Sequence, residues 1–277
     1  MAKELKTETG IFPGTKRAAY ELISGINFSS LKYLRKTPAH FRCAMTSPPE
    51  STAALHFGHC YHLAILEPER FKREVVRGLE GIDRRTKVGK NQWAEFVALN
   101  YDKEIMLPDE YDQIAEMQAA MMAHDTAREL LTSKGINELA AVWNDEESGE
   151  RCKGMIDRLT GLYGHTFVID LKTTKDAAAW SFARDVMAYS YAAQASFYMD
   201  GLYAIAPAER RWVHLVQEKQ PPYLPIVYEL SEDALAHGRK TYREWLRVYA
   251  DCKAKNAWPG YANGMHPLNL PKWASQA

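Results

Sequence analysis

The sequence predicts a mixed α/β (α+β) fold in which a central mixed β-sheet is flanked by helices. Three observations predict it: strand-like segments follow one another between residues 138 and 173, two helix-like segments come next, and two more strand-like segments precede a long C-terminal helix. With 277 residues, one core with decorating helices is the simplest organisation. We therefore expect one domain over residues 1–277, with a helical part at about 21–135, a sheet core at about 138–230 and a C-terminal helix and tail at 231–277.

The N-terminal part is predicted to be mainly helical. A helix starts near Ser29 or Ser30 and is stopped or bent by Pro38, and a second covers about residues 53–66. Residues 78–92 hold two glycines and a basic cluster, which indicates a mobile loop. The apolar spacing over residues 109–131 predicts one long helix.

The sheet core begins where the sequence pattern changes, at residue 138. Residues 139–144 and 151–159 are typical of a hairpin, and residues 166–173 of a third, buried strand. We expect helices at about 176–187 and 190–203, strands at 212–217 and 224–230, and a last helix at about 231–253. The proline-rich tail is expected to lie extended over the body.

Composition is that of an ordinary globular protein, with 46% hydrophobic residues and a formal net charge of zero. Neutrality gives no sign of a nucleic-acid partner, although a local basic groove is compatible with it. Four cysteines that are far apart predict free thiols in a reducing cytoplasm and argue against a zinc or iron–sulfur site. Because the chain has no signal-peptide pattern and no run of ~20 apolar residues, we expect a soluble, cytoplasmic protein with no membrane partner.

The sharpest chemical signal joins Asp157 to the run Asp170-Leu171-Lys172. Two carboxylates fall on adjacent predicted strands, and period two puts Lys172 on the same face as Asp170. Carboxylates hold a hard cation such as Mg²⁺, which activates water and offsets phosphate charge, while a lysine orients the water or stabilises developing charge. The alternative is a surface Asp–Lys pair on an edge strand. The apolar run before Asp170 argues against that alternative, because buried charges need partners or a metal.

Two helical segments carry further candidates. His62 lies on the predicted 53–66 helix, where it is either a satisfied core histidine or a residue that ligates or positions the cation. Tyr191, Gln194 and Tyr198 share one helix face. Aromatic residues at this spacing are usually core, but a glutamine among them suits a helix that faces a polar cleft.

Two basic stretches are candidates for phosphate contact. Arg84, Arg85 and Lys87 belong to the 78–92 loop, which either grips phosphates or is simply solvated. Ser29, Lys32 and Arg35 lie at a predicted helix N-terminus, a place that binds phosphate readily; we include the three as DNA-contact candidates.

Together these segments resemble the RecE (exodeoxyribonuclease VIII) group of the PD-(D/E)XK nuclease superfamily, in its phage and prophage form. The resemblance runs over nearly the whole chain and includes Ser29-Ser30-Leu31-Lys32, Phe57-Gly58-His59-Cys60-Tyr61-His62, Asp83-Arg84-Arg85-Thr86-Lys87, Asp157-Arg158, Asp170-Leu171-Lys172-Thr173-Thr174, Gln194 to Tyr198, Trp258-Pro259-Gly260-Tyr261 and Leu270-Pro271-Lys272-Trp273. It implies a restriction-endonuclease-like core.

The resemblance also assigns roles to residues. Metal contact is implied for His62, Asp157, Asp170 and Leu171, and catalysis for Asp157, Asp170, Lys172, Gln194 and Tyr198. The expected cation is Mg²⁺, with Mn²⁺ as the substitute. DNA contact is implied for Arg158, Thr173 and Thr174. The group's pattern commonly has arginine where this chain has Met155, and whether Glu138 joins the metal site is left open.

By this resemblance the protein is a 5′→3′ exonuclease on linear double-stranded DNA ends, which leaves 3′ single strands for a RecT-type annealing partner in a bacterial host cell. It also implies a homo-oligomeric ring. The alternatives are a PD-(D/E)XK endonuclease or RecB-like nuclease in DNA repair or replication, and a non-catalytic DNA-binding module that keeps the fold. An iron–sulfur RecB-like version is excluded, since Cys252 is the sole cysteine near the C-terminus.

Overall fold

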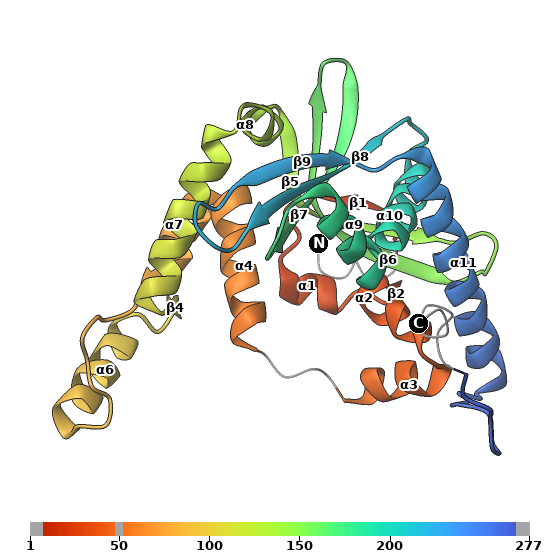
Figure 1. Ribbon diagram of the computed structural model, residues 1–277, viewed down its shortest axis with the longest axis horizontal. Helices are drawn as coiled ribbons and strands as arrows, with labels where there is room; N and C mark the ends of the chain where they lie inside the picture. The colour runs from red at the N-terminus through yellow and green to blue at the C-terminus, as the bar shows by residue number, and fades with distance from the viewer. Residues whose placement is uncertain (1–7, 48–51, 270–277) are drawn as a thin grey trace, which may run out of the picture.

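The computed structural model describes residues 8–47 and 52–269, and its centre is a mixed sheet with the strand order β1-β5-β6-β7-β8-β9 (Figure 1). Strands β7 and β8 run parallel, the other neighbours in this order run antiparallel, and β2 joins β6 in parallel. The strands are β1 (Gly10–Phe12), β2 (Ile26–Asn27), β5 (Gly135–Asn144), β6 (Arg151–Leu162), β7 (His165–Thr174), β8 (Arg211–Glu218) and β9 (Pro225–Glu229). The predicted fold class is confirmed.

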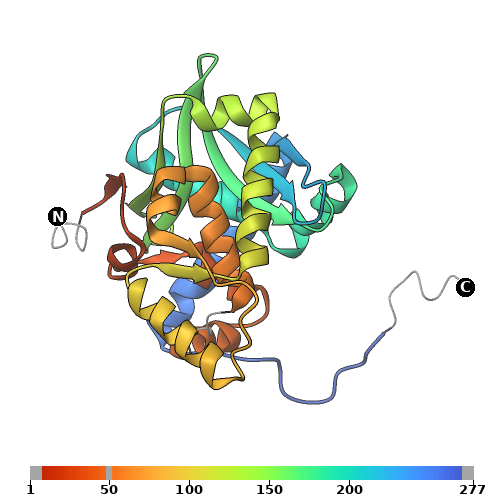
Figure 2. The ribbon, with the colours of Figure 1, turned by 90° about the vertical axis from the view of Figure 1, so that its left-hand side faces the viewer.

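Helices flank the sheet on both faces (Figure 1). The larger ones are α4 (Ala53–Leu66), α7 (Pro108–Ala123), α8 (Asp125–Thr132), α9 (Ala179–Ala188), α10 (Tyr191–Ile205) and α11 (Glu232–Lys255). On one face, α10 and α11 enclose a core that contains Phe197 and Trp143. On the other face, α4, α7 and α8 pack against β7 and β8, where Ile114 and Met117 are fully buried. Figure 2 shows α4 and α7 side by side.

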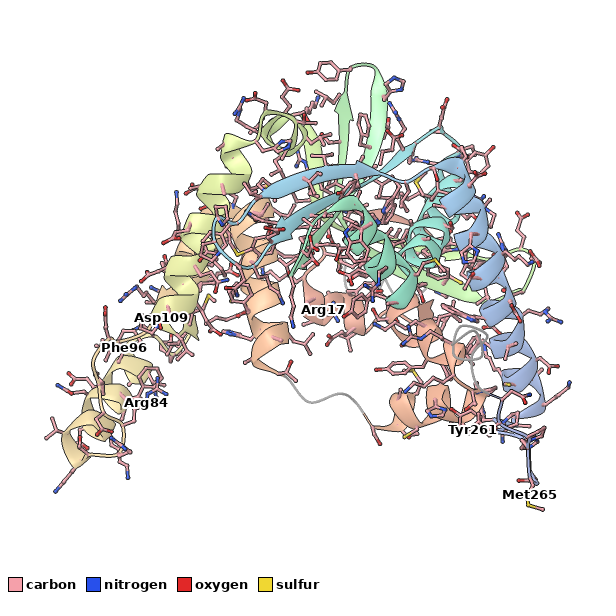
Figure 3. The ribbon with its side chains drawn as sticks, viewed as in Figure 1. Arg17, Arg84, Phe96, Asp109, Tyr261 and Met265 are labelled. Atoms are coloured by element: carbon pink, nitrogen blue, oxygen red, sulfur yellow. The ribbon has the colours of Figure 1, made fainter. Side chains whose placement is uncertain are left out.

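A second, two-stranded parallel sheet forms the base of an arm that projects from the α4 side. It pairs β3 (Val75–Arg77), which follows α5 (Pro68–Glu74), with β4 (Glu104–Met106). Between these strands, α6 (Lys87–Leu99) lies at the outer end of the arm, where Figure 3 labels Arg84 and Phe96. The arm therefore holds the basic cluster far from the sheet.

The N-terminal part of the chain forms several shorter helical elements. They are α1 (Arg17–Glu21), α2 (Phe28–Leu31), the 3₁₀ turn at Lys32–Arg35, and α3 (Pro38–Thr46). Asn27 caps α2 by accepting a hydrogen bond of 2.8 Å from the Ser30 amide, which confirms a helix start at this point. Beyond α11, Trp258 stacks on Phe41 with ring centroids 5.2 Å apart, so the start of the tail lies on the body. Residues 270–273 of the tail lie outside the described residues.

Three predicted elements differ from the structure. Pro38 does end one helical segment, but it also begins α3, because proline fits the first turn of a helix. The predicted loop at 78–92 ends early, since the Thr86 side chain caps α6 through the Gly89 amide. The predicted helix at 109–131 is split into α7 and α8 by the extended backbone of His124.

Among the described residues, none of the helices combines the length and the apolar character needed to span a lipid bilayer.

Candidate active site

The strand register places four polar residues in one row across the sheet. Asp170 on β7 is paired directly with His214 on β8. The last β6–β7 pair is Arg158 with Ile169, so Asp157 is the next residue opposite Asp170. On the other side of β6, the pairs before and after leave Glu138 of β5 opposite Asp157. The row therefore reads Glu138, Asp157, Asp170, His214.

The sheet opens at this row. Strand β6 pairs with β7 only from Arg158 to Leu162, and nearer its start, at Cys152 and Lys153, it pairs with β2 instead. Where the β6–β7 ladder stops, the backbone amide of Leu171 donates to Asp157 Oδ2 at 2.8 Å. A cavity of about 500 Å³ lies at this opening, and its lining includes Glu138, Asp157, Asp170, Lys172, His62 and Tyr198.

Glu138, which lines this cavity, has an unusual backbone conformation. Its φ of 47° lies in the left-handed region, which is uncommon for a residue other than glycine. Residues two apart normally share a face. Here Leu139 packs in the core under α10, whereas Asn137 donates to the Leu66 carbonyl at the end of α4. The alternation is thus interrupted at Glu138, beside Asp157, a pattern that commonly marks functional sites.

Asp170 is held by two partners. Lys172 Nζ lies 2.7 Å from Oδ1 and 2.6 Å from Oδ2 of this carboxylate. His214 Nδ1 lies 2.9 Å from Oδ2, and the His214 ring is fully buried. On the far side of that ring, Trp212 Nε1 donates to His214 Nε2 at 3.3 Å. Since an indole nitrogen only donates, Nε2 must accept, so Nδ1 carries the proton and donates it to Asp170.

A group of ligand-type atoms lies beside this carboxylate. One atom each from His62, Glu138 and Asp157 lies within 4.8 Å of the others, and His62 Nδ1 is 3.5 Å from Asp157 Oδ2. Burial lowers the pKa of His62, and the positive charge of Lys172 lowers it further. The ring is therefore neutral at neutral pH, as a metal ligand must be. Two carboxylates and an imidazole suit Mg²⁺ or Mn²⁺.

The carboxyl groups of the row titrate differently. Burial raises the pKa of both Asp157 and Glu138 to about 7, and repulsion adds to the shift, from Asp170 on Asp157 and from Asp157 on Glu138. Burial opposes ionisation of Asp170 as well, but the Lys172 ammonium and the His214 hydrogen bond outweigh it and hold the pKa of Asp170 below its ordinary range. Asp170 is thus ionised at neutral pH, whereas Asp157 and Glu138 are only partly ionised there, and a bound cation would favour their charged forms.

Helix α10 closes the cavity from the other face. Gln194 Nε2 lies 3.4 Å from Asp170 Oδ1, and the Tyr191 ring lies 4.8 Å from Lys172 Nζ. Tyr198 packs directly on β6: a Cβ added to Gly154 would lie only 2.6 Å from its ring. The lack of a side chain at Gly154 therefore leaves the space that the Tyr198 ring occupies. Gln194 and Tyr198 of α10 thus line the cavity, and Tyr198 also belongs to the hydrophobic core.

Some of the residues predicted to contact DNA lie next to the cavity. Ser29, Lys32 and Thr173 line an adjoining cavity of about 330 Å³ that also borders Lys172. Burial lowers the pKa of Lys32, and repulsion from Lys172 contributes to the same shift. Arg35 is near as well, but its guanidinium donates to the backbone carbonyl of Ala188.

Other predicted contact residues lie elsewhere. On the arm, Arg84 stacks over Trp93 at 3.3 Å, Arg85 pairs with Asp83 at 2.9 Å, and Lys87 starts α6. Figure 3 shows how far Arg84 lies from Arg17, which lines the cavity at the row.

Two of the predicted DNA contacts are buried in the body. The Arg158 guanidinium donates to the backbone carbonyls of Leu130 and Ser133 and to Asn137, and Thr174 donates to Asp185. Partners within the protein therefore use polar groups of both side chains.

Comparison with family profiles places the chain in a known family. The profile of a family described as "PDDEXK-like domain of unknown function (DUF3799)" matches residues 27–269, which include every residue of the row. The chain belongs to this family. A comparison of the DUF3799 chain with curated proteins finds no match.

The PDDEXK-like fold is also found among solved structures. The crystal structure of a "Putative exonuclease" from Eubacterium rectale is 12% identical, with a TM-score of 0.53, and the match covers 88% of this chain and 91% of that one. This likeness supports the fold. The crystal structure of SSO0001, also 12% identical, covers 68% of this chain and 86% of that chain at a TM-score of 0.29, and it carries no weight.

From the sequence alone the role of Glu138 stays open, and His214 is not predicted as a site residue. The structure brings Glu138 into the group with His62 and Asp157, and it brings His214 into contact with Asp170. Neither belongs to a local motif, because strand register alone aligns them. The one available sign was the isolated histidine in an otherwise apolar strand, Trp212-Val213-His214-Leu215. A buried histidine there requires a polar partner.

Proposed function

We propose that this protein is a metal-dependent nuclease that hydrolyses phosphodiester bonds of DNA. One observation carries the proposal: a single row of the sheet collects Glu138, Asp157 and Asp170 where the ladder opens, with Lys172 paired to the last of them. Placing three carboxyl groups close together in a buried site destabilises their ionised forms, and this raises the pKa of Glu138 and Asp157 to about 7. Such a cluster does not stabilise the fold by itself and is typical of a functional site.

The residues present fit a divalent cation. His62, Glu138 and Asp157 offer three ligand atoms close together, and Asp170 supplies a permanent negative charge beside them. When bound, such a cation polarises the scissile phosphate and lowers the pKa of a bound water.

The chain's own residues account for the remaining tasks. Burial lowers the pKa of Lys172, but Asp170 and Asp157 more than reverse this and raise it, so the lysine is protonated. A protonated lysine stabilises negative charge that develops on the phosphate, rather than acting as a base. His214 holds Asp170 in one orientation, and Gln194 offers an amide donor to the same carboxylate. Lys32 and Ser29, which border the adjoining cavity, are placed to meet the DNA backbone.

For the substrate, we propose linear double-stranded DNA degraded from its ends in the 5′→3′ direction, with 3′ single-stranded tails as product. The resemblance to the RecE group supports it, and the name of the Eubacterium rectale protein, "Putative exonuclease", agrees with degradation from an end. The same resemblance supports Mg²⁺ as the cation, a homo-oligomeric ring, a RecT-type annealing partner and a bacterial, phage-related setting in the cytoplasm. An endonuclease of the same fold and a DNA-binding module without catalysis are the competing functions.

The test uses matched linear and circular duplexes with Mg²⁺, the linear DNA carrying a label at each 5′ end or each 3′ end. We expect mononucleotides from the 5′ label on linear DNA, with the circle intact and with no release by Lys172→Ala. Cutting of the circle would instead establish an endonuclease. Binding without cleavage, across Mg²⁺ and Mn²⁺, would reject catalysis.

A further inference from the structure

A second group of metal-ligand side chains lies on α4, outside the cavity described above. His56 and Cys60 are four residues apart, so they share one face of the helix. Glu104 of β4 approaches that face from a segment 44 positions further along the chain. The three ligand atoms lie within 4.8 Å of one another.

The distances between these atoms are those of a metal site. His56 Nε2 lies 3.8 Å from Cys60 Sγ and 3.3 Å from Glu104 Oε2, and Cys60 Sγ lies 3.5 Å from the same Oε2. Tetrahedral zinc, with metal–sulfur bonds of about 2.3 Å and metal–nitrogen or metal–oxygen bonds of about 2.0–2.1 Å, separates its ligand atoms by about 3.3–3.6 Å. Two of the three separations fall within this range, and the third exceeds it by 0.2 Å.

The surroundings add a fourth participant and further negative charge. His59 Nε2 lies 3.2 Å from Glu104 Oε1, the oxygen that the other two residues do not approach. A donor in that place orients the carboxylate, as outer partners of metal ligands commonly do. Burial raises the pKa of the Cys60 thiol, and the negative charges of Glu104 and of Glu110 on α7 raise it further, so the thiol keeps its proton until a cation binds.

We propose that His56, Cys60 and Glu104 bind a zinc ion, with His59 as the residue that orients Glu104. Nitrogen and thiolate ligands select zinc over the magnesium that suits the carboxylates of the cavity. Binding releases the Cys60 thiol proton to solvent, and water fills the fourth position of the tetrahedron. The ion joins α4 to β4, and so fixes the base of the arm to the helix that carries His62.

The first measurement is the zinc content of protein purified without chelators and dialysed, by elemental analysis. Cobalt is then titrated into the zinc-free protein, because Co²⁺ bound to thiolate gives a charge-transfer band in the near ultraviolet and a tetrahedral site gives strong visible absorption. The titration is made in an Asp157→Asn background, so that the cavity does not compete. Oxygen and nitrogen ligands alone cannot give the thiolate band, which separates the two sites.

We expect one zinc per chain, and a thiolate band that Cys60→Ser removes and Cys43→Ser, at an exposed free cysteine, leaves intact. Glu104→Gln, at a half-exposed side chain, should weaken cobalt affinity by about 10–100-fold without affecting folding. It also keeps the test decisive if Cys60→Ser does not fold. Absence of the thiolate band in the parent, or an unchanged band in Cys60→Ser, would overturn the proposal, as would unchanged affinity in Glu104→Gln.

Discussion

Helix α4 contributes to two groups of ligand-type residues, and they differ in direction and in chemistry. His62 points to the sheet, where it meets Glu138 and Asp157. His56 and Cys60 point to β4, where they meet Glu104. At about 100° per residue, His62 is about 200° further round the helix than Cys60, so the two groups occupy opposite sides.

The chemical difference follows from the atoms on each side. The sheet side combines one imidazole with carboxylates, and Lys172 lies next to them, as phosphate hydrolysis requires. The β4 side combines an imidazole and a carboxylate with a thiol. The helix α4 can therefore contribute to both proposed metal sites. Ligand type gives each site its own metal preference, because carboxylates favour Mg²⁺ and a thiolate with imidazole favours zinc.

The largest expected effect is on DNA cleavage, which should depend on the residues on the sheet side of α4 and not on those on its β4 side. Asp170→Asn removes the permanently ionised carboxylate beside the cation and leaves Lys172 without its partner. We expect DNA cleavage to fall by about 10³-fold or more, measured as initial rates with saturating Mg²⁺. Glu104→Gln is the matched control on the other side of α4. It should keep the rate within about threefold of the parent under the same conditions, since no reacting atom meets it.

Equal losses in both variants would remove the distinction between the sides, and activity in Asp170→Asn would reject the proposed catalytic centre. Unfolding in urea, followed for both proteins, shows whether a loss reflects the site or the fold.

A smaller effect on metal binding or cleavage is expected from substitutions at His214, which contacts Asp170 from the neighbouring strand β8. This residue is a positioning residue, because it touches Asp170 and its ring is fully buried. His214→Leu removes the Nδ1 donor, and we expect the apparent Mg²⁺ affinity or kcat to fall by about 10–100-fold. His214→Asn can still donate to Asp170 and should recover much of the loss. If Asn and Leu have the same effect, burial alone explains the histidine and the hydrogen bond is dispensable.

The sequence predicts most of the fold because its elements are locally encoded. The hairpin of β5 and β6 and the buried strand β7 were predicted from apolar periodicity. A single capping residue can still shift the boundary of an element: Thr86 caps α6, so the helix begins inside the segment that was predicted to be a loop. The split at His124 was not predictable from the spacing of apolar residues, since α7 and α8 both continue it.

The site was predictable only where neighbours in sequence are neighbours in space. Asp170 and Lys172 lie two apart on one strand, so period two sufficed. Glu138 and His214 meet the row through register with other strands, and Glu104 meets α4 through the arm. Such contacts depend on tertiary structure, which local patterns do not specify.

Alanine substitutions at two glycines, Gly154 on β6 and Gly58 on α4, compare how tightly the two sides of the cavity are packed. Gly154→Ala puts a methyl group 2.6 Å from the Tyr198 ring, so we expect a loss of about 1–3 kcal/mol in the free energy of unfolding and reduced cleavage. Gly58→Ala on α4 meets nothing within 4 Å and should instead stabilise by about 0.5–1 kcal/mol, because alanine favours helix. Urea unfolding of both variants measures the contrast. A stable, active Gly154→Ala would show that the tyrosine moves freely.

The smallest effect concerns the charge balance of the sheet side, in the absence of metal. Folding raises the pKa of Glu138 from 4.5 to about 7, so the unfolded chain releases this proton first. Stability from this group is therefore fully present below about pH 4 and is lost as the pH rises through about 7. Glu138→Gln cannot ionise, so in chelator its stability relative to the parent should grow by roughly 1–2 kcal/mol between about pH 5 and pH 8.

Urea unfolding at each pH measures this difference, and Mg²⁺ reverses it, because the cation stabilises the ionised parent more than the amide variant. A difference that stays flat for Glu138→Gln would mean that Glu138 is already ionised without a cation, and that its proximity to Asp157 creates no requirement for one.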